Sequence, residues 1–177
     1  MVAAFKICLV LLFSLYSFAN EITPLEFKEL GFNIVKNNLD KSSFEFNKKY
    51  KYCESLENNI ILEKDLFKNL KLNKRDLGIV LLHFSLKAKK ECIKNEFNSL
   101  FSSYSQYVSF LKLHNFYPDK LQDANLAMEK LFSSDEISIK TNILYRKIAN
   151  EETKGYLESL DVLKYPFNSS KTLEQLK

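Results

Sequence analysis

Apolar residues recur at helical spacing along most of the chain after about residue 23. Each residue of a helix turns by about 100°, so side chains three and four positions apart share one face. Because polar residues fill the remaining positions, the pattern predicts an all-α fold. The expected helices are at about 24–38, 43–57, 60–70, 74–113, 119–132, 134–148 and 151–164, followed by a short C-terminal turn.

Helix start signals agree with several of these boundaries. Thr23 opens a capping box that Glu26 completes, and Pro24 occupies the first helical position. Similar four-residue boxes are found at Ser42–Glu45, Asn73–Asp76, Ser133–Glu136 and Thr172–Gln175. With three glycines and three prolines, the chain has too few turn residues for a β-sandwich or barrel. The stretch FEFNKKYKYC also alternates like a strand, but no partner strand is evident, so a helix is favoured.

The segment 74–113 carries apolar residues on two opposite faces. One face holds Leu77, Leu81, Phe84, Ala88 and Cys92, and the other holds Ile79, Leu82, Leu86, Ile93, Phe97, Leu100, Tyr104, Val108 and Leu111. Two apolar faces require packing partners on both sides. The sequence therefore predicts a compact multi-helix bundle around a long central helix at about 74–113.

The first nineteen residues have the layout of a secretory signal peptide. Lys6 precedes an apolar run, and Ser17 and Ala19 are the small residues expected before a cleavage site. The run has about a dozen residues, fewer than the ~20 that cross a bilayer as a helix. We therefore expect cleavage after Ala19, a single helical domain at 20–177, and a periplasmic or secreted protein that is not embedded in a membrane.

Cleavage would remove Cys8 and leave two cysteines. In an exported chain, an even pair predicts one disulfide, here between Cys53 and Cys92. His83 lies nine residues before Cys92, half a turn out of phase on the same helix, so the two cannot form a thiolate–imidazole pair. His83 is more simply a packed residue, and His114 is suited to cap the end of its helix.

Several functional classes lack their motifs in this sequence. There is no HExxH, CxxC, glycine-rich phosphate loop or GxSxG sequence, and we expect no metal site and no cofactor. The net charge is +4 and falls to +3 when Lys6 is removed, which is too small to indicate nucleic-acid binding. Carboxylate pairs remain as a catalytic resource, for example Glu91 with Glu96, and would suit a cell-wall hydrolase.

The favoured function is therefore non-catalytic: binding of another protein, in the manner of an inhibitor, immunity factor, adaptor or assembly accessory. Aromatic residues gather late in the central helix and just after it, and we expect Tyr107, Phe110, Phe116 and Tyr117 to contribute to a partner-binding patch if they are exposed. A helical carrier of an apolar small molecule is the alternative, and a carboxylate-based hydrolase is the third hypothesis.

Overall fold

The computed structural model describes residues 24–114, 119, 122–123, 126 and 135–176. Its elements are α2 (Pro24–Asn59), η1 (Lys64–Phe67), α3 (Lys74–His114), α5 (Asp135–Ile148), α6 (Glu151–Ser159), η2 (Asp161–Lys164) and α7 (Ser169–Gln175). The all-α prediction is confirmed. The expected signal peptide lies outside the described residues, and the single domain at 20–177 stays a prediction. No helix in the described part of the chain is both long enough and apolar enough to span a bilayer.

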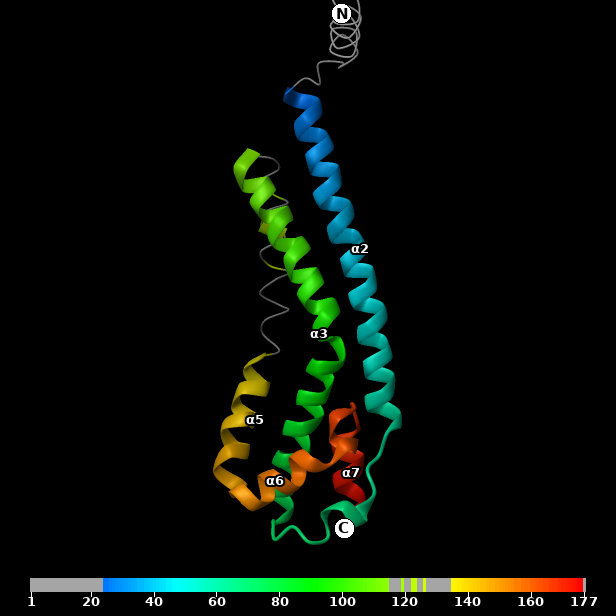
Figure 1. The fold of residues 1–177 in the computed structure, drawn as a ribbon, viewed down its shortest axis with the longest axis vertical. Coiled ribbons are helices and arrows are strands. Elements are labelled where there is room, and N and C mark those ends of the chain that lie inside the picture. The colour runs from blue at the N-terminus through cyan, green and yellow to red at the C-terminus, as the bar shows by residue number, and fades with distance from the viewer. Residues whose placement is uncertain (1–23, 115–118, 120–121, 124–125, 127–134, 177) are drawn as a thin grey trace, which may run out of the picture.

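Two long antiparallel helices, α2 and α3, form the frame of the molecule (Figure 1). Each buries a seam whose residues are spaced by three and four, as in a coiled coil. The rings of Phe46 and Phe97 are 6.1 Å apart between their centroids, and those of Phe32 and Tyr107 are 6.0 Å apart. The buried and partly buried residues of α2 at this spacing are Phe32, Val35, Leu39, Ser42, Phe46, Cys53 and Leu56. Cys92, Phe97 and Tyr107 of α3 contact this seam.

The helix α2 runs without interruption through the break expected between 38 and 43. That boundary was based on the capping box at Ser42, and it is wrong. Within the helix, the Ser42 hydroxyl donates to the carbonyl of Leu39 at 3.0 Å instead of capping a new helix. A serine can hydrogen-bond the preceding turn when its face is covered, so the box residues lie in the middle of a longer helix. The strand-like stretch FEFNKKYKYC is helical as favoured.

The start of α3 is where its capping box placed it. The side-chain oxygen of Asn73 accepts from the Asp76 backbone N–H at 2.9 Å, and its amide donates to the Asp76 carboxylate at 2.8 Å. These bonds satisfy a backbone donor of the first turn that has no partner within the helix. The helix ends at His114, one residue beyond the predicted end. The central position of this helix is also confirmed, because α2, α5, α7 and η2 all contact it.

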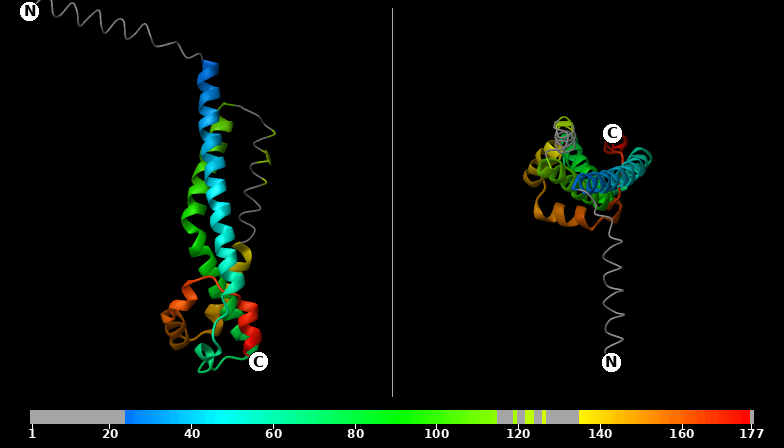
Figure 2. Two further views of the ribbon diagram at one scale, coloured as in Figure 1. Left: turned by 90° about the vertical axis from the view of Figure 1, so that its right-hand side faces the viewer. Right: turned by 90° about the horizontal axis from the view of Figure 1, so that it is seen from above.

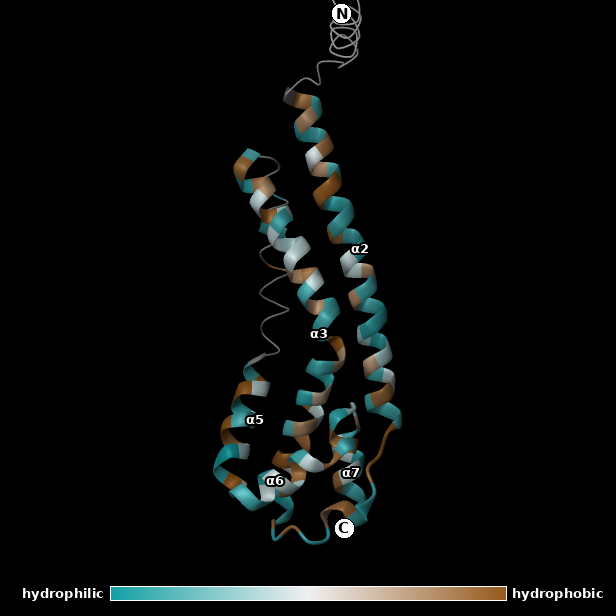
Figure 3. Cartoon of the chain, in the orientation of Figure 1, coloured by the Kyte–Doolittle hydropathy of each residue, from teal (hydrophilic) through white to brown (hydrophobic). Residues whose placement is uncertain are grey.

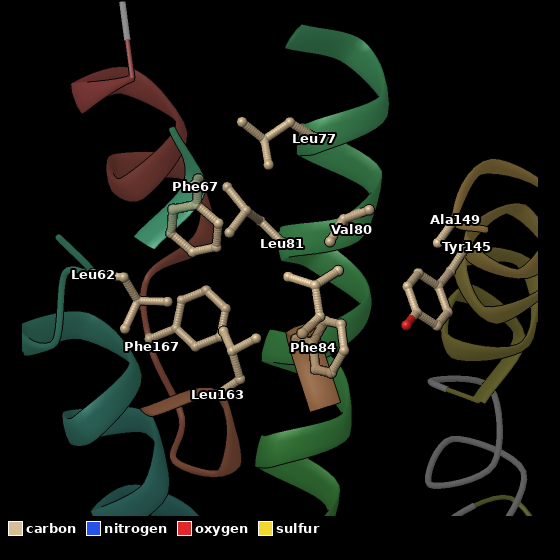
Figure 4. Close-up of a cluster of buried hydrophobic side chains, with 11 residues drawn as sticks. Leu62, Phe67, Leu77, Val80, Leu81, Phe84, Tyr145, Ala149, Leu163 and Phe167 are labelled. Carbon is tan, nitrogen blue, oxygen red and sulfur yellow. The ribbon is translucent and has the colours of Figure 1, made fainter. Parts of the chain in front are cut away.

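The hydrophobic core fills one end of the α2–α3 pair. There α5, α6, η2 and α7 gather around the first half of α3, as Figure 2 shows from two further sides. Leu81 and Phe84 of α3 are among its most buried side chains. The cluster, drawn in Figure 4, comprises Leu62, Phe67, Leu77, Val80, Leu81, Phe84, Tyr145, Ala149, Leu157, Leu163 and Phe167. The predicted face of α3 that carries Leu77, Leu81 and Phe84 therefore supplies the centre of the hydrophobic core.

The C-terminal segment closes this core. Phe167 has no exposed surface, and its carbonyl accepts a hydrogen bond from the buried hydroxyl of Ser85 at 2.8 Å. Thr172, also fully buried, accepts from the backbone N–H of Leu62 at 3.2 Å. The capping box predicted to begin at Thr172 is therefore wrong: Asn168 caps α7, accepting from the Lys171 backbone N–H at 2.9 Å.

The predicted disulfide between Cys53 and Cys92 is present and joins α2 to α3. Cys53 is fully buried in the α2–α3 seam, and Cys92 is partly buried. Two other expected helices are shorter than predicted. The segment 60–70 contains only the 3-10 turn η1, and 151–164 divides into α6 and η2 at Leu160, whose backbone is extended.

Candidate functional site

A cleft of about 670 Å³ lies where α3, α5 and α6 meet. The three helices contribute side chains from positions 83–91, 138–146 and 154–158. Four of the lining residues are cationic and two are anionic, so the cleft is positive on balance. The residues are His83, Lys87, Lys90, Glu91, Ser138, Ile139, Asn142, Tyr145, Arg146, Lys154 and Glu158.

A stacked pair of rings joins α3 to α5 within this cleft. The rings of His83 and Tyr145 are parallel to within 10°, with centroids 4.3 Å apart. Phe84 meets the Tyr145 ring edge-on at 5.4 Å, so the tyrosine packs between two neighbouring residues of α3. The packing role expected of His83 is thereby confirmed. Because stacked rings hold each other in place, the pair sets the orientation of α5 against α3.

Tyr145 carries a polar group that the fold does not satisfy. The side chain is 4% exposed, and its buried hydroxyl has no hydrogen-bond partner among the described residues. Burial raises the pKa of Tyr145 to about 12, with smaller contributions from the carboxylates of Glu158 and Glu151. The hydroxyl is therefore protonated at neutral pH and able to donate.

His83 is neutral at pH 7. Its partial burial, followed by the positive charge of Lys87, lowers the pKa of His83 from 6.5 to about 4; Glu158 opposes this shift and Arg146 adds to it. A cation of α3 and a cation of α5 are therefore both close enough to repel a proton from the same ring.

Lowering the pH from 6.5 to 4 is expected to destabilise the fold through His83. In this window the unfolded chain protonates the ring and the folded chain does not, so the free energy of unfolding falls as the pH falls. The loss should be below about 3 kcal/mol, because solvent screens a partly exposed ring. Urea unfolding of the wild type and of His83→Gln across this range checks it. If both proteins show the same pH dependence, the expectation is wrong.

A second cleft of about 420 Å³ adjoins the first along α3 and shares Lys87, Glu91 and Glu158 with it. Its floor is apolar and its remaining rim residue is Lys164. The floor residues are Phe84, Ala88, Leu157, Leu160 and Leu163. Glu91, one of the carboxylates considered for hydrolysis, forms an ion pair with Lys94 at 3.0 Å.

The outer face of α5 exposes four large aliphatic side chains. Ile139 and Ile143 are one turn apart on one side of the helix, where Ile139 also lines the cleft, and Ile137 and Leu144 lie together more than a quarter turn further round. Their exposed fractions are 58%, 49%, 59% and 42%, respectively. Figure 3 shows apolar turns along this helix. A helix with apolar residues on its outer as well as its inner side usually has a partner on both.

The aromatic residues expected in a partner-binding patch lie elsewhere. Tyr107 is 8% exposed and packs against Phe32 of α2, so it does not meet the condition of exposure. Phe110 is partly buried against Gly31, where a Cβ atom would come within 2.7 Å of its ring. Phe116 and Tyr117 lie outside the described residues. The partner-binding role of these four residues stays a prediction.

In the portions of the chain that can be described, no three histidine, cysteine or acidic side chains are grouped as a metal site would require. Comparison with protein-family models, curated proteins and solved structures found no match to this chain. The argument about function therefore depends on the cleft and on the exposed face of α5.

Proposed function

We propose that this protein is an exported, non-catalytic protein that binds another protein through the outer face of α5. The exposure of Ile137, Ile139, Ile143 and Leu144 on one short helix is the observation that carries the proposal. Large apolar side chains exposed together on one helix are typical of interaction surfaces. An amphipathic helix commonly docks such residues into a groove of its partner.

The charges around this face indicate the chemistry of the partner. Lys140, Arg146 and Lys147 border the aliphatic residues, and Glu136 forms an ion pair with Lys140 at 2.6 Å. The border is therefore basic on balance. A complementary surface has an apolar groove whose rim carries aspartate or glutamate, since opposite charges steer the encounter and fix its orientation. We propose a partner protein of that kind.

Export is supported by the disulfide. A Cys53–Cys92 bond persists in oxidising compartments, such as a periplasm or the extracellular space, and is rare in the cytosol. Residues 1–19 also have the layout expected of a signal peptide. We therefore place the partner in the envelope or outside the cell.

The double substitution Ile139→Lys/Ile143→Lys is expected to abolish partner binding and to leave the fold intact. Exposed positions tolerate such changes within about 0.5 kcal/mol of unfolding free energy, whereas two charges facing an apolar groove cannot be solvated there. Native mass spectrometry of the tagged protein from its host would show a bound protein of defined stoichiometry for the wild type and none for the variant.

The matched control is Phe44→Lys. Phe44 is 65% exposed and lies on α2, far from α5 in the sequence. This variant should retain the partner. Equal retention by the α5 variant would contradict the proposal, and an added mass equal to that of the chain itself would assign the face to self-association instead.

A further inference from the structure

We infer that the cleft between α3, α5 and α6 binds a small organic anion, whose carboxylate or phosphate group lies between the side chains of Lys87 and Arg146. Ile139 and Arg146 of α5 contribute both to this cleft and to the exposed surface of that helix, but the inference does not depend on the proposed protein partner. It is argued from the charges of the cleft, from the hydroxyl of Tyr145 and from the size of the space.

The first argument is the convergence of positive charge. Lys87 on α3 and Arg146 on α5 line the same cleft, and the charges of both oppose protonation of the His83 ring. Lys154 already forms an ion pair with Glu151 at 2.7 Å, but Arg146 has no ion pair among the described residues. Glu91 and Glu158 also line the cleft, but its four cations outnumber them, so the cleft attracts an anion; a guanidinium can bind a carboxylate or phosphate through two hydrogen bonds.

The second argument is the buried hydroxyl of Tyr145. Tyr145 lines the cleft, and its hydroxyl is protonated, has almost no exposed surface and has no acceptor among the described residues. Figure 4 shows the ring reaching from α5 toward α3, with the oxygen at its far end. A buried donor without an acceptor destabilises a fold, so a ligand oxygen that accepts from it would gain binding energy.

The third argument is size. A cleft of about 670 Å³ is in the range of sites for small organic molecules and is far larger than a bare ion requires. Ile139 and the stacked rings of His83 and Tyr145 offer an apolar surface to the rest of the ligand. The adjoining cleft, with its floor of leucine and phenylalanine side chains, extends that surface.

His83 provides a direct measurement of occupancy. An anion beside the ring should raise its pKa, because it offsets the positive charges that now oppose protonation. The charged and titratable groups that face this ring are Lys87, Lys90 and Glu91 from α3, Tyr145 and Arg146 from α5, and Lys154 and Glu158 from α6. With only two histidines in the sequence, the imidazole signals are simple to assign by substitution.

The experiment follows the His83 imidazole by NMR through a pH titration of the full exported chain. Titrations are run in sodium chloride and, at the same ionic strength, in sodium acetate or sodium phosphate at tens of millimolar, where weak binding is detectable. We expect the His83 pKa to rise in at least one of the two anions. A rise in acetate alone indicates a carboxylate ligand, and a rise in phosphate alone indicates a phosphate ligand.

Variants separate binding from general ion effects. Arg146→Gln and Lys87→Gln should each weaken the response about tenfold, as expected when one charged hydrogen-bonding partner is removed. Lys147→Gln, on the same helix but outside the cleft, should respond like the wild type. Tyr145→Phe should bind more weakly while unfolding at the same or a higher urea concentration, because its hydroxyl has no partner in the described part of the chain. The inference is overturned if neither anion raises the pKa, or if Arg146→Gln and Lys87→Gln respond like the wild type.

Discussion

Replacing Cys53 and Cys92 together by serine is expected to lower the free energy of unfolding by about 4 kcal/mol. The disulfide closes a loop across a sequence separation of 39 residues, and the entropy of closing a loop of that length in the unfolded chain gives a value of this size. The loss should be concentrated in the α2–α3 pair, where Cys53 is fully buried in the seam. Urea unfolding followed by circular dichroism measures it.

The same unfolding experiment with reductant provides the control. Reduction should destabilise the wild type by a comparable amount and should not change the double serine variant, which has no bond to break. If the reduced wild type is as stable as the oxidised protein, the disulfide does not support the α2–α3 frame.

Truncating Phe167 to alanine is expected to cost about 3–5 kcal/mol of unfolding free energy. The side chain is fully buried in the core cluster, and removing a buried phenylalanine leaves a cavity that the surrounding side chains fill only in part. Because the carbonyl of Phe167 also holds the Ser85 hydroxyl, the C-terminal segment should detach from α3 more readily.

Tyr165→Ala is the matched control, two residues away and 61% exposed, and should change stability by less than about 0.5 kcal/mol. Hydrogen exchange can locate the effect: amides of α7 should lose protection in Phe167→Ala and keep it in Tyr165→Ala. Equal stability of the two variants would contradict the place given to Phe167 in the core.

The long helices could be predicted because the spacing of apolar residues is a local property of the sequence. The disulfide could be predicted because few cysteines are available to pair. The repeated apolar positions from Leu77 to Leu111 identify α3, and an exported chain with two cysteines leaves one pairing. The predicted break at Ser42 failed because a capping box is a local signal, and the packing of α2 against the second half of α3 outweighs it.

The cleft could not be predicted, since it depends on which helices become neighbours. His83 was expected to pack, but nothing in the sequence indicates that Tyr145, 62 positions later, stacks against it. The burial of Tyr107 could not be predicted from the sequence either. The spacing of apolar residues shows on which side of α3 Tyr107 lies, but not that Phe32 of α2 covers it. The segment 137–144 contains four large aliphatic residues, which is more than one buried stripe of a short helix requires. The exposed aliphatic residues of α5 could therefore have been noticed in the sequence.

Site-specific photocross-linking in the native host would test the central claim most directly. A photoreactive residue at Ile143, on the outer face of α5, should form one adduct of defined mass with a protein whose binding surface is acidic. The same residue at Phe44 should form none, and the Ile139→Lys substitution should remove the Ile143 adduct. Adducts of the same mass from both positions, or none from Ile143, would contradict the claim that this protein binds its partner through α5.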